Sequence, residues 1–528
     1  MPENQRFRSI PDIARTFAET QGEKSALVCG DQRRSYAELH SDSNRIAQAL
    51  IAAGVEPGDR VAFLDKNVPE YFTLIFGAAK ARAVTVAVNW RLAPPEMAYI
   101  LNHARVKLLI VGREFLGHLD EMEFESEPQV VVVGSAAGDR QGFTDWLGAH
   151  EDIDPKLPCE WEDTCYQLYT SGTTGLPKGV ELTNRNFFGM LSGASKAWNF
   201  DAESINLVAM PLFHIAGSGW GLVGLYNGGT NVILREVDPS EILKAIQSHR
   251  ITNALLVPAV LQILLATPGI EATDFSSVRS IIYGASPITE EVLVGAMRAT
   301  GVPLLQVYGA TETTGAITLL RAEDHDPGGP KAHLLRSAGL PFEGVELRIV
   351  DPNSMKDCPE GEVGEVWTRS RQNLKAYYAD PEATLAVYPE GRDADGLGWL
   401  RTGDAGYLRD GYLFIHDRVK DMIVSGAENI YPAEIENILM DHPAVADVAV
   451  IGVPDEKWGE TVKAVIVPAS GEDASDAEVI AWCRERLAHF KCPTSVDRVE
   501  GIPRNPSGKI LKTELRAPYW KGRKRMVN

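Results

Sequence analysis

An alternation of short apolar runs with amphipathic segments constrains the fold of this chain more than any other feature. Between residues 30 and 112 the spacing predicts strands and helices in turn, at Val61–Leu64 (strand), Pro69–Ala83 (helix), Val84–Val88 (strand), Pro94–Ala104 (helix) and Lys107–Val111 (strand). Apolar runs resume at Asn206–Met210, Thr230–Leu234, Ser280–Tyr283 and Leu304–Val307. Strands that alternate with helices form parallel sheets, because each helix returns the chain across a sheet face. The pattern therefore predicts an α/β fold.

A different pattern begins near residue 340. Short β-like runs at Val345–Val350, Gly364–Thr368 and Tyr412–His416 are separated by Gly, Pro and Asp, which is typical of a small β unit. The charged segment Asp417–Asp421 follows, and then a compact α/β piece, in which a capping box at Ser475 predicts a helix to about Phe490. We therefore expect a large N-terminal domain of parallel-rich αβ layers with a small β-barrel unit (1–417), a charged boundary segment (418–421) and a small α+β C-terminal domain (422–528).

Composition and charge exclude several classes of protein. The 528 residues are 44% apolar and carry a net charge of −20, which disfavours general nucleic-acid binding. The six cysteines include no Cys-x-x-Cys pair, which argues against a zinc site or a disulfide scaffold and favours a reducing compartment. The first residues contain no apolar secretory signal, and the most apolar stretch, Ala254–Ala266, is too short to span a bilayer. We therefore expect a cytoplasmic protein with no membrane span.

The strongest local signal is the segment from Tyr169 to Gly179, which reads YTSGTTGLPKG. Glycines let backbone N–H groups approach a ligand closely, hydroxyls add donors, and a lysine offsets anionic charge. The segment is not a Walker A loop, because no Gly-Lys-Ser/Thr follows at the required spacing. It predicts a phosphate-binding loop, and a surface loop rich in Ser, Thr and Gly is the alternative. The candidate residues are Thr170, Ser171, Gly172, Thr173, Thr174, Gly175 and Lys178.

A second signal, Tyr308-Gly309-Ala310-Thr311-Glu312, follows the apolar run Val302–Val307. Ligands of α/β proteins bind at the carboxyl ends of strands, where this segment is expected. Glu312 is a candidate Mg²⁺ ligand, because magnesium prefers carboxylate and phosphate oxygens, and Tyr308 is a candidate for stacking on a base. A turn with a solvated glutamate is the alternative.

Three weaker signals lie elsewhere in the chain. Arg401–Asp404 ends in an aspartate after a tight turn, which can accept the two hydroxyls of a ribose. Pro503–Lys509 is a turn-rich loop that presents one lysine, and a solvated lysine is its simplest interpretation. Gly219–Gly224 matches G-x-G-x-x-G but lacks a clear strand–turn–helix context, so we expect no dinucleotide site there.

Taken together, these segments resemble the adenylate-forming (ANL) superfamily of acyl-CoA synthetases, firefly-type luciferases and peptide-synthetase adenylation domains. The motifs occur in one order along the chain, ending with SGAENIYPAEIE and NPSGKI, and the resemblance runs from about Arg34 to Leu511. It implies a large N-terminal domain, a small mobile C-terminal domain and an active site between them. It also implies two steps, in which MgATP and a carboxylate give an acyl-adenylate and pyrophosphate, and a thiol then displaces AMP.

The resemblance assigns roles to the residues of the phosphoryl-transfer chemistry. The loop from Thr170 to Lys178 would hold the β- and γ-phosphates of ATP, Thr311 would touch the α-phosphate, and Glu312 would bind Mg²⁺. Lys509 would bridge the substrate carboxylate and the α-phosphate. Transfer of this kind depends on positioning and charge stabilisation, which a lysine and Mg²⁺ supply.

The resemblance also assigns the nucleoside and the hinge. Asp404 and Arg418 would bind the ribose, and Lys420 would be the hinge. The wall for adenine and the acyl carbonyl would be formed by Gly284, Ala285, Ser286, Tyr308 and Gly309.

The acyl side of the site is expected at Phe213 and His214, which match the aromatic motif that closes the acyl pocket in the family; a core histidine with satisfied hydrogen bonds is the alternative for His214. Amino-acid-activating relatives carry an aspartate where His214 stands, so an α-amino acid is disfavoured. The uncharged run after His214 disfavours a second carboxylate. Several long-chain synthetases have a gating tryptophan where this chain has Ser218, and the nearest tryptophan is Trp220. Small residues here indicate either room for a long or bulky acyl group or tight helix packing: Gly217, Gly219, Gly221 and Gly224.

Coenzyme A is the expected thiol. The segment Val453–Glu460 resembles the CoA-ligase segment of the family, in which Trp458 would contact the pantetheine arm; a surface-packed aromatic is the alternative. Gly426 and Ala427 lie beside the expected pantetheine passage, where relatives commonly have a second glycine in place of Ala427.

The sequence therefore predicts an ATP-dependent acyl-CoA ligase for an apolar monocarboxylate, a medium- or long-chain fatty acid, with Lys509, Glu312, Thr311 and His214 as catalytic residues and with ATP, Mg²⁺ and coenzyme A as cofactors or co-substrates. Two alternatives stay open: acyl transfer to the phosphopantetheine of a carrier protein, and ligation of a bulky aryl or steroid-type carboxylate. A nucleotide-binding regulatory protein is disfavoured by retention of Glu312 and Lys509. The oligomeric state, including a homodimer, is left open.

Overall fold

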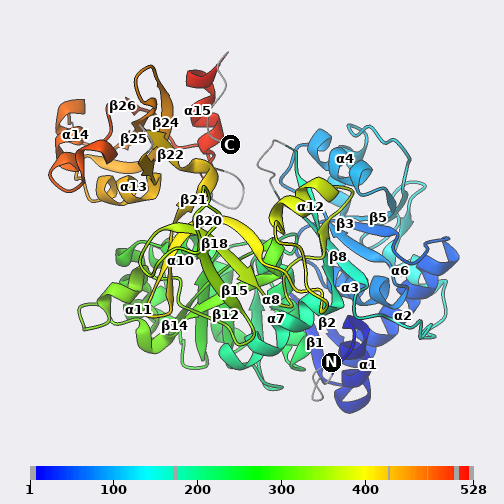
Figure 1. Ribbon diagram of the computed structural model, residues 1–528. Helices are drawn as coiled ribbons and strands as arrows, with labels where there is room; N and C mark the ends of the chain where they lie inside the picture. The colour runs from blue at the N-terminus through cyan, green and yellow to red at the C-terminus, as the bar shows by residue number, and fades with distance from the viewer. Residues whose placement is uncertain are drawn as a thin grey trace. The chain divides into compact units, whose positions relative to one another are not determined.

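The structure is a computed structural model that describes residues 7–170, 176–286, 288–425, 428–471, 474–504 and 510–521 (Figure 1). The chain divides into two compact units. The first comprises Met1–Glu346 and Thr368–Leu400, and the second comprises Leu347–Trp367 and Arg401–Asn528. No helix in the described part of the chain is long and apolar enough to cross a membrane.

Two sheets form the centre of the first unit. Within the described residues, the larger sheet has nine strands in the order β16 (Leu340–Pro341), β15 (Gly315–Leu320), β14 (Leu304–Ala310), β13 (Ser280–Gly284), β12 (Asn253–Leu255), β10 (Ile205–Val208), β11 (Thr230–Ile233), β1 (Ser25–Cys29) and β2 (Gln32–Ser35). The strands from β14 to β1 pair in parallel, and the two ends of the sheet are antiparallel. The predicted parallel α/β architecture is confirmed.

The second sheet of this unit has eight strands among the described residues, in the order β19 (Ala376–Tyr377), β9 (Lys178–Thr183), β8 (Thr164–Thr170), β4 (Val84–Ala87), β3 (Arg60–Leu64), β5 (Val106–Val111), β6 (Gln129–Val132) and β7 (Gln141–Gly142). All four residues of β4 are buried, as expected for a central parallel strand that helices cover on both faces. Strand β9 returns antiparallel beside β8, and β19 pairs with β9 across about 200 residues of sequence.

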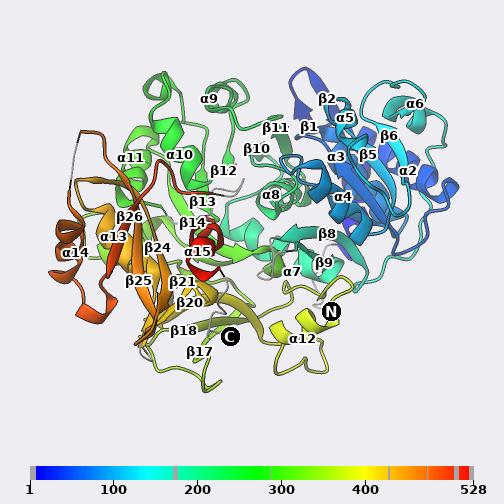
Figure 2. The same cartoon turned by 90° about the horizontal axis from the view of Figure 1, so that it is seen from above.

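Helices separate and flank the two sheets (Figure 2). They are α1 (Ile10–Gln21), α2 (Tyr36–Ala52), α3 (Pro69–Lys80), α4 (Pro94–His103), α5 (Leu116–Leu119), α6 (Phe143–Gly148), α7 (Asn184–Ala197), α8 (Ile215–Tyr226), α9 (Pro239–Ser248), α10 (Pro258–Leu265), α11 (Glu290–Thr300) and α12 (Pro381–Val387). Helix α3 contacts strands of both sheets, and α8 packs on β10, β11 and β15 of the larger one. Local residues determine where several helices start. Ser35 and Glu38 form a capping box at the N-terminus of α2, and α3, α4 and α10 begin with proline.

The second unit contains two smaller sheets. The first has the order β17 (Glu346–Val350), β18 (Gly364–Arg369), β20 (Leu400–Arg409) and β21 (Tyr412–Arg418). The second has the order β23 (Glu428–Ile430), β22 (Ile423–Ser425), β25 (Gly459–Pro468) and β24 (Val445–Asp455), with β26 (Ser495–Arg498) parallel to β25. Its helices are α13 (Pro432–Met440), α14 (Asp476–Arg484) and α15 (Lys512–Trp520). The predicted small β unit and the following α/β piece are both present, and the domain bounds at 417 and 422 remain a prediction.

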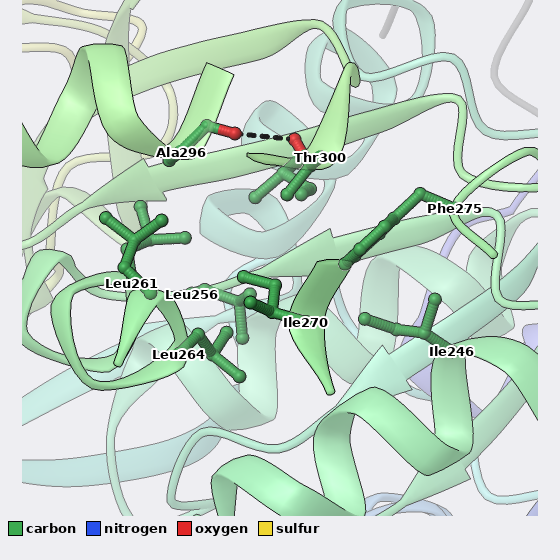
Figure 3. Close-up of a pocket in the computed structure, with 10 residues that line it drawn as sticks. Ile246, Leu256, Leu261, Leu264, Ile270, Phe275, Ala296 and Thr300 are labelled. Carbon is green, nitrogen blue, oxygen red and sulfur yellow. Dashed lines mark hydrogen bonds between the residues drawn. The ribbon is translucent and has the colours of Figure 1, made fainter. Parts of the chain in front are cut away.

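The core of the first unit is closely packed. A hollow among its helices α9, α10 and α11 has a volume of about 10 Å³ and is lined by leucine and isoleucine side chains together with Phe275, Ala296 and Thr300 (Figure 3). That volume is about the size of one water molecule, and the hydroxyl of Thr300 already donates to the carbonyl of Ala296 (2.8 Å), so the lining offers little to hold a ligand. This hollow is therefore a packing defect and not a ligand site.

Most predicted strands and helices differ from the structure by one to three residues at an end, and α3 ends at Lys80 and not at Ala83; three further differences bear on the site or the fold. Strand β14 continues through Tyr308 to Ala310, because the antiparallel pairing with β15 extends the ladder past Val307. Asp404 lies inside strand β20 and not after a turn, although Gly403 has a left-handed φ of 73°. Helix α14 ends at Arg484 and not near Phe490, because the chain must turn back to place β26 parallel to β25.

Candidate active site

The carboxyl ends of four parallel strands bring the predicted nucleotide and acyl residues to one edge of the larger sheet. Strands β10, β12, β13 and β14 pair in parallel, so their ends at Val208, Leu255, Gly284 and Ala310 point the same way. This edge is where open α/β sheets bind ligands.

The position of Glu312 is fixed by a tight hairpin between β14 and β15. A methyl group at Gly309 would lie 1.9 Å from the carbonyl oxygen of Gly315, so the two strands approach at a glycine. The hairpin contains the short helix Thr311–Thr313, and Thr314 adopts a left-handed φ of 52°. The hydroxyl of Thr313 donates to the carbonyl of Gly315 (2.6 Å). Thr311 and Glu312 therefore project from a short, braced turn.

Two hydroxyls hold the Glu312 carboxylate by the same oxygen. Tyr377 Oη donates to Glu312 Oε1 at 3.0 Å, and Thr170 Oγ1 donates to it at 3.4 Å. Because both bonds go to Oε1, neither engages Oε2, the oxygen that a cation can take. A single carboxylate with phosphate oxygens is the usual protein setting of Mg²⁺, so this arrangement fits the predicted metal role.

Lys178 lies in the same cluster. Its ammonium is 3.7 Å from Asp380 Oδ2 and 5.2 Å from the centre of the Tyr377 ring. The structure thus brings Thr170 and Lys178 of the predicted phosphate loop together with Glu312 around Tyr377. Ser171, Gly172, Thr173, Thr174 and Gly175 lie outside the described residues.

Helix α4 anchors both ends of the predicted phosphate loop. Tyr99 Oη donates to the carbonyl of Pro177 (3.2 Å), and His103 Nδ1 lies 2.8 Å from Tyr169 Oη. Burial lowers the pKa of His103, so its imidazole is neutral at pH 7. The two residues are four apart on one helix face and therefore reach the loop side by side.

The predicted adenine wall is close-packed backbone. A methyl group at Gly284 would lie 2.2 Å from the carbonyl oxygen of Val307 on the neighbouring strand. Ala285 then takes a left-handed φ of 66°, which costs a non-glycine residue about 1–2 kcal/mol. Ser286 follows, and Tyr308 stands on β14 beside this turn. The backbone strain supports a ligand-facing role for this turn.

His214 stands at the N-terminus of α8, with its ring against Phe213 at 4.6 Å between centroids. Its carbonyl accepts hydrogen bonds from Ser218 N (3.0 Å) and Ser218 Oγ (3.1 Å), which begins the helix. Trp220 is buried and donates to the carbonyl of Leu207 (2.9 Å), so it does not line an acyl entrance.

The small residues of α8 serve close packing. A methyl group would lie 2.2 Å from Pro211 O at Gly217, 2.2 Å from Phe72 Cζ at Gly221 and 2.3 Å from Asn231 Oδ1 at Gly224. These three positions therefore leave no space for an acyl chain, and the packing alternative holds for them. The G-x-G-x-x-G match lies within this helix, which confirms that it is not a dinucleotide loop.

In the second unit, Asp404 of β20 is paired in register with Arg418 of β21. Buried Glu365 organises the preceding residues: it accepts from Arg401 Nε (2.8 Å) and from the backbone N–H of Gly403 (3.2 Å). The side chains of Arg418 and Lys420 lie outside the described set, as do residues Gly426, Ala427 and Lys509.

Trp458 occupies the tip of the β24–β25 hairpin. It is 49% exposed, and the ammonium of Lys457 lies 4.4 Å from the centre of its ring. Its backbone N–H donates to Asp455 Oδ1 (2.8 Å). The side chain is thus presented to solvent and not packed against a core, which supports the predicted role in contacting a ligand.

The sequence analysis missed three residues that act on the site. Tyr377 and Asp380 reach Glu312 and Lys178 because β19 pairs with β9, and Glu365 braces the Arg401–Asp404 segment. The only local signal was Asp380-Pro381, an N-cap before a helix. Long-range strand pairing places the others.

Comparison with known proteins identifies the family of the chain. The family model described as AMP-binding enzyme matches residues 14–378, and the AMP-binding enzyme C-terminal domain matches residues 434–509. The chain is 40% identical to a fatty acid–[acyl-carrier-protein] ligase, ScoC, of Streptomyces coeruleorubidus, over 95% of each chain. It is 37% identical to the long-chain-fatty-acid–CoA ligase FadD13 of Mycobacterium tuberculosis (93% of this chain, 94% of that one) and 38% identical to a feruloyl-CoA synthase of Amycolatopsis (94% and 96%).

Solved structures give the same result. The crystal structure of ATP-bound MatB from Rhodopseudomonas palustris superposes with a TM-score of 0.86 at 29% identity, over 98% of this chain and 100% of that one. The chain therefore belongs to the AMP-binding enzyme family. It is an ATP-dependent, AMP-forming acid–thiol ligase, which confirms the predicted superfamily and type of reaction. The acid and the identity of the thiol differ among these relatives.

Proposed function

We propose that this enzyme activates a medium- or long-chain fatty acid as its acyl-adenylate and transfers the acyl group to coenzyme A. The observation that carries the first step is the meeting of Thr170, Lys178 and Glu312 around Tyr377. The uncharged start of α8 beside His214 supports an apolar acid. Two relatives named for fatty acids support the same class.

In the first step a carboxylate oxygen attacks the α-phosphorus of ATP, a mixed anhydride forms, and pyrophosphate leaves. Lys178 and the hydroxyls of the loop would hold the departing phosphates, and Glu312, whose Oε1 accepts from Tyr377 and Thr170, would hold Mg²⁺. Bound Mg²⁺ supplies positive charge next to the phosphates. Thr311 and Lys509 contact the α-phosphate, and the Gly284–Ser286 turn with Tyr308 and Gly309 receives adenine.

In the second step the thiolate of coenzyme A attacks the acyl carbon, and AMP leaves with the bonding electrons. We assign the ribose to Asp404 and Arg418, the hinge to Lys420, and the pantetheine passage to Gly426, Ala427 and Trp458. The exposure of Trp458 at a hairpin tip supports the last assignment.

Pyrophosphate release with a panel of acids tests the substrate. The panel contains decanoate, palmitate, ferulate and malonate, each with saturating MgATP. The proposal expects the highest kcat/KM with decanoate or palmitate and no release with malonate. A higher kcat/KM with ferulate refutes the fatty-acid assignment and favours the aromatic acids of the feruloyl-CoA synthase relative.

A carrier protein is the second candidate acceptor, since the relative with 40% identity is named as an acyl-carrier-protein ligase. The test supplies enzymatically made acyl-adenylate with either coenzyme A or a phosphopantetheinylated carrier protein. Thioester formation on coenzyme A at the higher kcat/KM supports the proposal, and the reverse order assigns the carrier protein.

A further inference from the structure

The loop that presents Phe213 and His214 is held by a single buried amide. Asn67 lies between β3 and α3 and is 3% exposed. Its Oδ1 accepts from the backbone N–H of Leu212 (3.0 Å), and its Nδ2 donates to the carbonyls of Met210 (3.1 Å) and Leu234 (3.0 Å). One side chain thus ties the loop after β10 to the end of the neighbouring strand β11.

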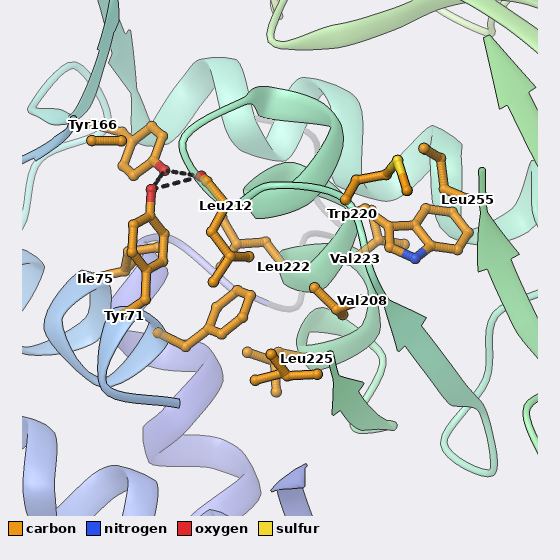
Figure 4. Close-up of a cluster of buried hydrophobic side chains, with 14 of the residues drawn as sticks. Tyr71, Ile75, Tyr166, Val208, Leu212, Trp220, Leu222, Val223, Leu225 and Leu255 are labelled. Atoms are coloured by element: carbon orange, nitrogen blue, oxygen red, sulfur yellow. Dashed lines mark hydrogen bonds between the residues drawn. The ribbon is translucent and has the colours of Figure 1, made fainter. Parts of the chain in front are cut away.

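Two buried tyrosines, Tyr71 and Tyr166, hold the same loop at the carbonyl group of Leu212. Tyr71 Oη donates to the carbonyl of Leu212 (2.8 Å), Tyr166 Oη approaches this carbonyl at 3.4 Å, and the two phenols are hydrogen-bonded to each other (Figure 4). Both the N–H and the C=O of Leu212, two residues before His214, are therefore fixed by side chains from α3, β8 and the loop before α3.

Helix α8 closes the loop from the opposite side. The methyl group missing at Gly217 would lie 2.2 Å from Pro211 O and 2.6 Å from Met210 O. Backbone atoms cannot move aside as a flexible side chain does, so the loop has no room to shift toward α8. The loop thus lies between Gly217 of α8 on one side and the hydrogen bonds from Asn67 and Tyr71 on the other. These hydrogen bonds therefore set its position.

We infer that Asn67 and Tyr71 are positioning residues for the carboxylate substrate: they set the loop Leu212–His214, and through it the fit of the acid to the site. The inference rests on the proposed placement of the acyl group beside His214. In this proposal neither side chain touches the substrate. Each acts through its hydrogen bond to the backbone of Leu212.

The nucleotide residues on β13 and β14 stand apart from this clamp, and Tyr71→Phe leaves Tyr166 in place on β8, the strand that ends at Thr170. Glu312 and Tyr308 belong to β14 and its hairpin, and Gly284 ends β13, whereas the loop leaves β10. In the larger sheet β10 is separated from β13 by β12. Loss of the clamp should therefore raise KM for the acid and spare KM for ATP, a split that a general loss of stability does not produce.

The first test compares Tyr71→Phe with Tyr36→Phe. Tyr36 is a matched control, since it is fully buried and its hydroxyl donates to the carbonyl of Gly229 (2.6 Å), beyond the far end of α8. Removing one hydrogen bond to the loop should raise KM for the best acid of the panel about three- to tenfold, with KM for ATP unchanged within about twofold. Tyr36→Phe should leave both KM values within about twofold of wild type.

A second variant, Asn67→Ser, removes the bonds to Met210, Leu212 and Leu234 together. It should raise KM for the acid more than Tyr71→Phe does. It should also reduce the differences in kcat/KM between acids of different chain length. If this variant does not fold, the phenylalanine pair still decides the question. Equal effects of Tyr71→Phe and Tyr36→Phe on KM for the acid, or equal rises in KM for acid and ATP, overturn the inference.

The outcome is separable from that of the proposed function. The acid panel on the wild-type enzyme alone decides whether the substrate is a fatty acid. The comparison of the two phenylalanine variants uses whichever acid the wild type prefers. A preference for ferulate thus refutes the fatty-acid proposal while the clamp is still tested.

Discussion

Replacing Tyr377 with phenylalanine should raise the Mg²⁺ requirement of adenylation. The phenol donates to Glu312 Oε1 at 3.0 Å, and the substitution removes this bond but keeps the ring beside Lys178. Without it, the carboxylate keeps only the longer contact from Thr170 (3.4 Å) and gains rotational freedom. Fewer of the rotamers that the Glu312 side chain adopts then point Oε2 toward a cation.

The size of the effect follows from the strength of that bond. A hydrogen bond to a charged group contributes about 1.5–3 kcal/mol, and the contact from Thr170 retains part of it, so we take the lower value. A loss of about 1.5 kcal/mol corresponds to a rise of about tenfold in the Mg²⁺ concentration for half-maximal rate. At saturating Mg²⁺ the rate should fall by no more than about threefold, because the carboxylate itself remains.

The assay is pyrophosphate release at fixed ATP and acid over a series of Mg²⁺ concentrations. Tyr378→Phe is the matched control: it alters the next residue but keeps its ring, which packs against the guanidinium of Arg60 (3.9 Å) and the ring of His103 (5.7 Å between centroids). A wild-type Mg²⁺ dependence in Tyr377→Phe would refute the reasoning. So would an equal shift in Tyr378→Phe, which would assign the effect to the strand and not to the hydrogen bond.

Three further outcomes are expected. Glu365→Gln should raise KM for ATP about tenfold without changing KM for the acid, because its contacts to Arg401 and Gly403 brace the proposed ribose site; unchanged kinetics would separate that brace from nucleotide binding. Lys509→Ala should slow overall ligation about 10²–10³-fold but leave conversion of pre-made acyl-adenylate to thioester within a few-fold, and equal losses in both half-reactions would contradict alternation of the small domain. Burial lowers the pKa of Lys80 from 10.5 to about 7, so the unfolded chain binds this proton more tightly. The free energy of unfolding of the wild type, relative to that of Lys80→Met, should therefore rise by about 2–3 kcal/mol between about pH 7 and about pH 9. A difference between the two proteins that does not change with pH would show that the lysine does not titrate in this range.

Local pattern was sufficient for most strands and helices, but not for their ends. The α3 and α4 helices begin at the predicted residues, because Pro69 and Pro94 are local signals. The end of α14 depends on where β26 must return, and the length of β14 depends on its pairing with β15. Those are tertiary constraints that no window of sequence contains.

The site divides in the same way. Glu312 and Lys178 could be chosen from motifs, since their neighbours carry a recognisable order of glycines and hydroxyls, whereas His214 could be chosen only through the resemblance to the family. Tyr377 and Asn67 could not, because their roles come from pairing and burial: Tyr377 acts through a strand of two residues, and Asn67 is one polar residue in an ordinary loop. The α8 glycines are ambiguous in sequence, and only the atoms opposite them show close packing.

The β14–β15 hairpin has a consequence for how such an enzyme diversifies. Tyr308 and Glu312 ride on one hairpin that closes at Gly309 and Gly315, so a mutation that moves one moves the other. The loop before His214 leaves the sheet three strands away, so its residues can change without altering the strand pairing that holds the hairpin, even though α8 packs on β15. Selection can thus exchange the acid while inheriting the nucleotide chemistry intact. Two relatives with nearly equal identity to this chain, one named for a fatty acid and one for ferulate, fit this separation of the acyl side from the nucleotide side.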